Sequence, residues 1–146
     1  MTDFPSPWIR RGALLAILLL FLMVWGFAGF SKLQSGVPVW FPDKFGNTIL
    51  AKFPGLTASF WMLALAELAG FGLAVVALLR GEFLERTPPV WTSWMLVWSL
   101  FVFVQLGLGQ WLTAEFNGTA QLFAYFAGTL VCLLFVGSSR PRVVGS

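Results

Sequence analysis

Residues 57–79, TASFWMLALAELAGFGLAVVALL, form the stretch of sequence that decides the fold. About 20 apolar residues, rising 1.5 Å each as a helix, cross the hydrocarbon core of a bilayer. Three further stretches have the same length and character, at about 12–30, 90–112 and 119–137. The sequence therefore predicts an all-α membrane protein, with four transmembrane helices forming a single domain over residues 1–146.

The composition supports lipid as the solvent of this chain. Of its 146 residues, 58% are hydrophobic and 10% are charged, whereas a soluble domain has about 25% charged residues. The formal charge of +3 comes from basic residues that flank the apolar stretches, so membrane lipids are expected partners and nucleic acid is not. The lone cysteine, Cys132, lies in an apolar run and is expected to be a small packed side chain.

The chain has one cysteine and no histidine, which removes the usual ligands of haem, iron–sulfur and most transition-metal sites. We therefore expect no cofactor held covalently or by metal ligands. A quinone or a lipid is the kind of ligand that such a chain can still bind.

The basic residues predict an orientation. An even number of spans puts both termini on one side, and all six arginines fall there: Arg10, Arg11, Arg80, Arg86, Arg140 and Arg142. The opposite side holds Lys32, Lys44 and Lys52. By the positive-inside rule both termini are cytoplasmic, and we expect a multi-pass protein of the inner (cytoplasmic) membrane.

The long connection at 33–56 carries Phe41, Phe45, Ile49 and Phe53, one apolar residue at every fourth position. This spacing predicts a short amphipathic helix that lies in the outer interface or caps the bundle. A lid over a site and a loop anchored by its aromatic residues are the two alternatives.

Glu67 is the only charged residue inside the four apolar stretches. An acid at membrane depth is costly unless it is protonated or paired, so it is a candidate functional residue. Its neighbours on the same helical face include Ala64, Gly70 and Ala74, and small residues let helices approach closely in lipid. Glu67 is thus expected to face another helix, about 15 Å below the outer end of its span.

The candidate partners of Glu67 are Lys32, Gln105 and Tyr125. Lys32 lies at the outer end of the first span, so a direct pair requires that span to end deeper in the membrane than the stretch 12–30 places it. Gln105 and Tyr125 lie about 10 Å below the outer ends of their spans. We predict a polar cluster of these four residues. It is either a protonatable site or a set of hydrogen bonds that holds helices together.

Other residues indicate helix packing. Trp25 and Trp98 lie deep in their spans and are expected to pack between helices. Small residues at close helical spacing provide packing surfaces for the chain itself or for partners: Gly26, Gly29, Ala66, Gly70, Gly107, Gly109, Ala124 and Gly128.

Two of these stretches resemble a known family. Residues 26–33, GFAGFSKL, resemble the glycine-then-lysine signature that closes the first helix of DoxX-like membrane proteins. Residues 67–81, ELAGFGLAVVALLRG, are similar to the second-helix pattern of that family: an acid, a glycine pair, aliphatic residues and a closing glycine. The resemblance covers about residues 10–137.

The resemblance implies a small four-helix membrane protein without a cofactor of its own. It places Gly29, Lys32, Glu67 and Gly70 at motif positions. Some family members are subunits of terminal quinol oxidases or of a thiosulfate:quinone oxidoreductase, and others are linked to membrane defence against oxidative stress.

Three functions are compatible with these observations. We expect a cofactor-free integral membrane subunit of a larger respiratory or other quinone-linked electron-transfer complex, with a structural or assembly role and other membrane subunits as partners. The first alternative is a quinone-reactive oxidoreductase subunit. In it Glu67 is the proton donor or acceptor, and Lys32 or Tyr125 polarises a quinone oxygen. The second alternative is a small proton-coupled transporter. Catalytic activity of the chain alone stays undecided, and the residues favour its absence.

Overall fold

The computed structural model describes residues 6–138, and this part of the chain is helical without strands. Its long helices are α1 (Pro7–Ser35), α4 (Leu56–Leu79), α5 (Val90–Leu112) and α6 (Phe116–Gly137). Each is long and apolar enough to cross a membrane. Because a spanning segment must satisfy its backbone polar groups internally, helices are the form that such apolar stretches adopt. The prediction of an all-α chain with four candidate spans is confirmed.

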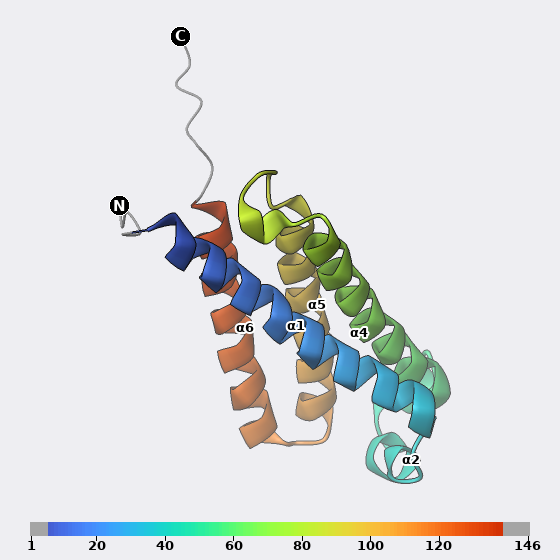
Figure 1. The fold of residues 1–146 in the computed structure, drawn as a ribbon. Coiled ribbons are helices and arrows are strands. Elements are labelled where there is room, and N and C mark those ends of the chain that lie inside the picture. The colour runs from blue at the N-terminus through green and yellow to red at the C-terminus, as the bar shows by residue number, and fades with distance from the viewer. Residues whose placement is uncertain (1–5, 139–146) are drawn as a thin grey trace.

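Three short helices connect the long ones. Helices α2 (Trp40–Phe45) and α3 (Ile49–Lys52) lie between α1 and α4, and the 3₁₀ helix η1 (Glu82–Leu84) lies between α4 and α5. The start of α1, the end of α6 and η1 lie at one end of the bundle, and α2 lies at the other (Figure 1). We call these the arginine end (Arg10, Arg11, Arg80 and Arg86) and the lysine end (Lys32, Lys44 and Lys52).

Helix α1 is longer than the apolar stretch at 12–30. Its start is capped by Ser6, whose Oγ accepts a hydrogen bond from the backbone N–H of Trp8 at 3.3 Å, and Pro7 occupies the first turn. Its end is set by Gly36, which has φ of 61° and donates its N–H to the carbonyl of Lys32. Hydropathy misses these terminal turns because they carry arginine, serine and lysine. Because α1 continues to Ser35, Lys32 lies inside a regular helix.

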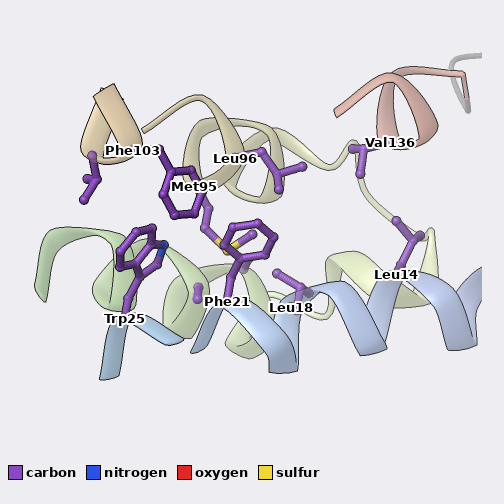
Figure 2. Packing of buried hydrophobic residues seen from close by; sticks show 11 residues of the cluster. Leu14, Leu18, Phe21, Trp25, Met95, Leu96, Phe103 and Val136 are labelled. Carbon is purple, nitrogen blue, oxygen red and sulfur yellow. The ribbon is translucent and has the colours of Figure 1, made fainter. Parts of the chain in front are cut away.

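Each long helix packs against the next long helix along the chain. Contacts join α1 to α4, α4 to α5 and α5 to α6, and α6 is the least buried of the four. Figure 2 shows the main core between α1 and α5, where Phe21 and Trp25 point toward Met95 and Phe103.

Glycines permit the close approach of α1 and α4. A Cβ on Gly29 would lie 2.8 Å from Leu68, one on Gly70 would lie 2.8 Å from Trp25, and one on Gly26 would lie 3.0 Å from Phe71. Side chains at these positions would force the helices apart. Small residues therefore determine which faces of α1 and α4 meet.

Within residues 6–138, the remaining small residues that the sequence marks for helix packing make no tight packing contact with another helix. A Cβ on Gly107 or Gly128 would meet nothing within 4 Å among the described residues, and Ala124 is exposed. A Cβ on Gly109 would lie at an ordinary 3.7 Å from Phe45. Ala66 is half-buried. Of the small residues that the sequence marks for helix packing, those in tight contact therefore lie on α1 and α4. Helix α6 has a tight glycine contact of its own, since a Cβ on Gly118 would lie 2.8 Å from Gln110 of α5.

The two deep tryptophans tie helices together. Trp25 is 1% exposed, and its Nε1 donates to the Ser99 hydroxyl at 2.8 Å. The Nε1 of Trp98 donates to the carbonyl of Ala66 at 2.8 Å. Both indole N–H groups therefore have a hydrogen-bond acceptor on another helix.

The loop between α1 and α4 is broken in its middle. Phe41 and Phe45 of α2 are buried, whereas Ile49 and Phe53 are exposed by 64% and 80%. A turn at 46–48 separates α2 from α3, so the four apolar residues do not share one helical face. Phe41 and Phe45 pack with Phe60 at the lysine end, in an aromatic cluster separate from the main core.

Candidate functional site

Lys32 and Glu67 form an ion pair between α1 and α4. The Lys32 Nζ donates to Oε1 of Glu67 at 2.9 Å, to Oε2 at 2.8 Å and to the carbonyl of Ala28 at 3.4 Å. These three bonds use the three protons of the ammonium group. The extension of α1 through Ser35 is what brings Lys32 to the depth of Glu67.

The two side chains of the pair differ in exposure. The Glu67 side chain is 2% exposed and that of Lys32 is 22% exposed. A buried carboxylate is tolerated in this position because a cation with good hydrogen-bond geometry compensates its desolvation. Glu67 therefore lies behind Lys32, and Lys32 is the member of the pair that can meet a ligand.

A cavity of about 660 Å³ adjoins this pair at the lysine end. Its walls come from α1, α2, α4 and α5 and include Lys32, Phe45, Phe60, Leu63 and Gln105. Ligand cavities in proteins measure about 300–1,000 Å³ and are mostly apolar with a few polar groups. The size and lining of this lysine-end cavity match that description.

The predicted polar cluster is only partly assembled. Lys32 and Gln105 line the same cavity, with Glu67 directly behind Lys32. Tyr125 does not join them. It lies on α6 and is 56% exposed, and its ring centroid lies 6.1 Å from that of Phe103, with the two rings tilted. Helix α6 packs along α5, and that packing turns Tyr125 away from Glu67.

Two buried polar atoms also belong to residues that line the cavity. The hydroxyl oxygen of Ser59 and Oε1 of Gln110 are inaccessible to solvent and have no hydrogen-bond partner among residues 6–138. Neither residue stands out in the sequence, because a single serine near a helix start and a glutamine near a helix end are common. Only the assembled bundle places them beside the cavity.

An ion pair joins two loops at the lysine end. The Lys44 Nζ lies 2.6 Å from Oε1 of Glu115, and the two side chains are 29% and 47% exposed. Lys44 belongs to α2 and lines the cavity, and Glu115 immediately precedes α6. The pair thus connects the short helix over the cavity with the turn between α5 and α6.

Glu82 is a buried acid that sequence reasoning missed. It lies on η1, is 2% exposed, and accepts hydrogen bonds from the backbone N–H groups of Trp91 at 2.9 Å and Thr92 at 2.8 Å. The Thr92 hydroxyl donates to it at 2.7 Å. Glu82 therefore caps the start of α5. The sequence shows no local capping signal, because Glu82 lies nine residues before Trp91, the first residue whose N–H it accepts.

The arginine end is held by Arg10. Its side chain pairs with Glu85, donates from Nη2 to the carbonyl of Phe135 at 3.3 Å and lies 4.8 Å from the Phe135 ring centroid. Arg10 thereby connects α1 with the loop after η1 and with the end of α6. Arg140 and Arg142 lie outside the described residues.

The comparisons with known proteins leave the family open. Neither a family model, nor a curated protein, nor a solved structure matches the chain. The resemblance to DoxX-like proteins therefore rests on residues 26–33 and 67–81 alone. The site must be interpreted from its own geometry.

Proposed function

We propose that this chain is a cofactor-free integral membrane subunit of a larger, quinone-linked electron-transfer complex, and that it holds a quinone headgroup in the lysine-end cavity. The observation that supports the proposal most directly is the position of Lys32. A cation fixed by a buried carboxylate borders an apolar, aromatic-walled cavity of suitable volume. The family resemblance of the two helix motifs points in the same direction.

The cavity offers a quinone both kinds of contact that its headgroup needs. Phe45 and Phe60 supply aromatic surface for a flat ring. Lys32 supplies a charged donor for one ring oxygen, by redirecting the N–H that now makes the 3.4 Å bond to Ala28. The bonds to Glu67 keep the ammonium in place during that exchange.

The roles of Lys32 and Glu67 differ in this proposal. Lys32 contacts the quinone oxygen and stabilises the negative charge that develops on it when an electron arrives. Glu67 acts as a positioning residue, because it is 2% exposed and lies behind Lys32. This arrangement favours Lys32 over Glu67 as the group nearest the ligand.

Partners complete the proposed reaction. Converting a quinone to a quinol takes two electrons and two protons, and the chain has neither histidine nor a cysteine cluster to hold a redox centre. Other subunits would supply the electrons, and the protons would enter from the lysine end of the bundle.

We place the protein in the inner (cytoplasmic) membrane with the arginine end in the cytoplasm. Arg10, Arg11, Arg80 and Arg86 lie at this end, and the lysines lie at the other. The exposed Ile49 and Phe53 of the loop would then lie in the outer interface. This topology is tested by fusing a reporter that is active only in the cytoplasm after α4 or after α1. The fusion after α4 should be active, and the fusion after α1 should be inactive.

Quinone binding is measured by quenching of the tryptophan fluorescence of the purified protein with a short-chain quinone. The informative variant combines Lys32→Met with Glu67→Gln, so that no charge is left unpaired. Because a hydrogen bond to a charged group contributes about 1.5–3 kcal/mol, the dissociation constant should rise about tenfold or more. Lys52→Met is the matched control, because Lys52 is exposed and does not line the cavity.

Equal affinity of the double variant and the native protein would remove Lys32 from the site. The subunit role is tested separately by purification from native membranes in mild detergent, followed by mass spectrometry and an optical spectrum. Redox subunits in stoichiometric amounts are expected. A colourless chain that purifies alone would contradict that role.

A further inference from the structure

The segment 37–54 forms a separate unit over the lysine-end cavity. It lies between two glycines with positive φ, Gly36 at 61° and Gly55 at 103°. Its helix α2 lies beyond the ends of α1 and α4 (Figure 1). Four of the six residues of α2 line the cavity: Trp40, Phe41, Lys44 and Phe45.

The apolar attachment of this segment is the small aromatic cluster. The ring centroid of Phe41 lies 4.7 Å from that of Phe45 and 5.4 Å from that of Phe60. This cluster is separate from the main core of the bundle. Moving α2 would therefore disturb few of the contacts that hold α1, α4 and α5 together.

The polar attachment is the ion pair between Lys44 and Glu115. It joins α2 to the turn that precedes α6. Both side chains are partly exposed, by 29% and 47%. Exposed pairs of this kind shift an equilibrium by only about two- to fivefold and are weakened by salt. Such a contact can hold a closed position and still be broken readily.

We propose that segment 37–54 is a movable cap that controls access to the lysine-end cavity, and that the Lys44–Glu115 ion pair is its latch. The glycines at its two ends accept the changes in backbone dihedral angle that movement requires. When the cap opens, an amphipathic molecule in the outer interface can reach Lys32 past Phe41 and Phe45. The identity of that molecule rests on the proposed function, whereas the movement of the cap does not.

The cap is tested with a buried thiol. Cys132→Ser removes the native cysteine, and Ser59→Cys places a near-isosteric thiol where the hydroxyl oxygen is inaccessible to solvent. The full chain in lipid nanodiscs is treated with a charged maleimide, and the rate of labelling reports how often the cavity opens.

Breaking the latch should speed this labelling. We expect Lys44→Gln to raise the rate about two- to fivefold. The reversed pair, Lys44→Glu with Glu115→Lys, should return the rate close to its starting value. High salt should accelerate labelling with the native pair and have little effect with Lys44→Gln. Lys52→Gln is the control, because it removes a nearby charge that does not line the cavity, and it should leave the rate unchanged.

Two results would overturn the proposal. If Lys44→Gln labels at the native rate, the ion pair is not a latch. If the native pair labels as fast as a thiol at the exposed Thr57, the segment does not close the cavity.

A second reporter keeps the test valid if Ser59→Cys does not fold. Gly109→Cys is suitable because its Cβ would lie 3.7 Å from Phe45, directly beneath the cap. The labelling experiment contains no quinone. A failure of quinone binding and a failure of the cap are therefore separate results.

Discussion

Removing the two partners of the Lys32–Glu67 ion pair one at a time should destabilise the bundle unequally. We consider Lys32→Met, Glu67→Leu and the double variant. Lys32→Met leaves a carboxylate that is 2% exposed without its cation, whereas Glu67→Leu leaves an ammonium group that is 22% exposed. The lysine can turn its flexible side chain toward the cavity at the lysine end, and the carboxylate has no such path.

The magnitudes follow from these exposures. Removing one partner of a buried ion pair costs about 3–5 kcal/mol, and we expect Lys32→Met to fall in that range. Glu67→Leu leaves a partly solvated group and should cost about 1–3 kcal/mol. The double variant replaces both charges with apolar side chains and should lie within about 1 kcal/mol of the native stability. Its effect should thus be several kcal/mol smaller than the sum of the two single effects.

The assay is reversible unfolding in mixed micelles, followed by tryptophan fluorescence and circular dichroism. Lys52→Met removes an exposed lysine outside the site and should leave the free energy of unfolding unchanged within about 0.5 kcal/mol. The reasoning is refuted if the single variants are equally stable, or if the effect of the double variant equals the sum of the single effects. Equal losses would show that the difference in exposure does not set the cost, and additive losses would show that the two charges do not interact.

The remaining predictions concern helix contact and capping. Gly70→Ala should lower the free energy of unfolding by about 1–3 kcal/mol, because its Cβ would lie 2.8 Å from Trp25. The Cβ of Gly72→Ala would meet nothing within 4 Å among residues 6–138, so this variant should be neutral or stabilising by up to about 1 kcal/mol. Equal effects of the two variants would contradict the close contact at Gly70. Glu82→Ala should cost about 2 kcal/mol and fray the start of α5, measured by thermal unfolding and by amide exchange, because three donors lose their acceptor. Unchanged exchange at Thr92 would show that Glu82 is not the cap.

The structure separates what hydropathy can predict from what it cannot. The apolar stretches at 90–112 and 57–79 agree with α5 (Val90–Leu112) and closely with α4 (Leu56–Leu79), because Pro89 precedes α5 and Gly55 and Gly81 flank α4. The first stretch is short of α1 at both ends, since polar residues occupy its terminal turns. Because the last turn of α1 is missing from that stretch, the sequence does not place Lys32 at the depth of Glu67 and does not predict their direct pair.

The candidate site shows a second limit. The depth of Gln105 and Tyr125 follows from the rise of a helix, and both were placed in one cluster with Glu67 on that basis. Depth fixes one coordinate of a side chain, but the rotation of a helix about its axis depends on its neighbours. The packing of α6 along α5 leaves Tyr125 exposed, whereas Gln105 reaches the cavity.

The sequence by itself determined four helices that are long and apolar enough to cross a membrane, because apolar stretches of this length satisfy their backbone in lipid only as helices. It also marked Glu67 as an acid that needs compensation. Only the tertiary structure decided that the compensating charge is Lys32, since glycines on α1 and α4 let those two helices meet face to face. The cavity and the cap over it likewise depend on residues far apart in the chain, whose meeting is a property of packing.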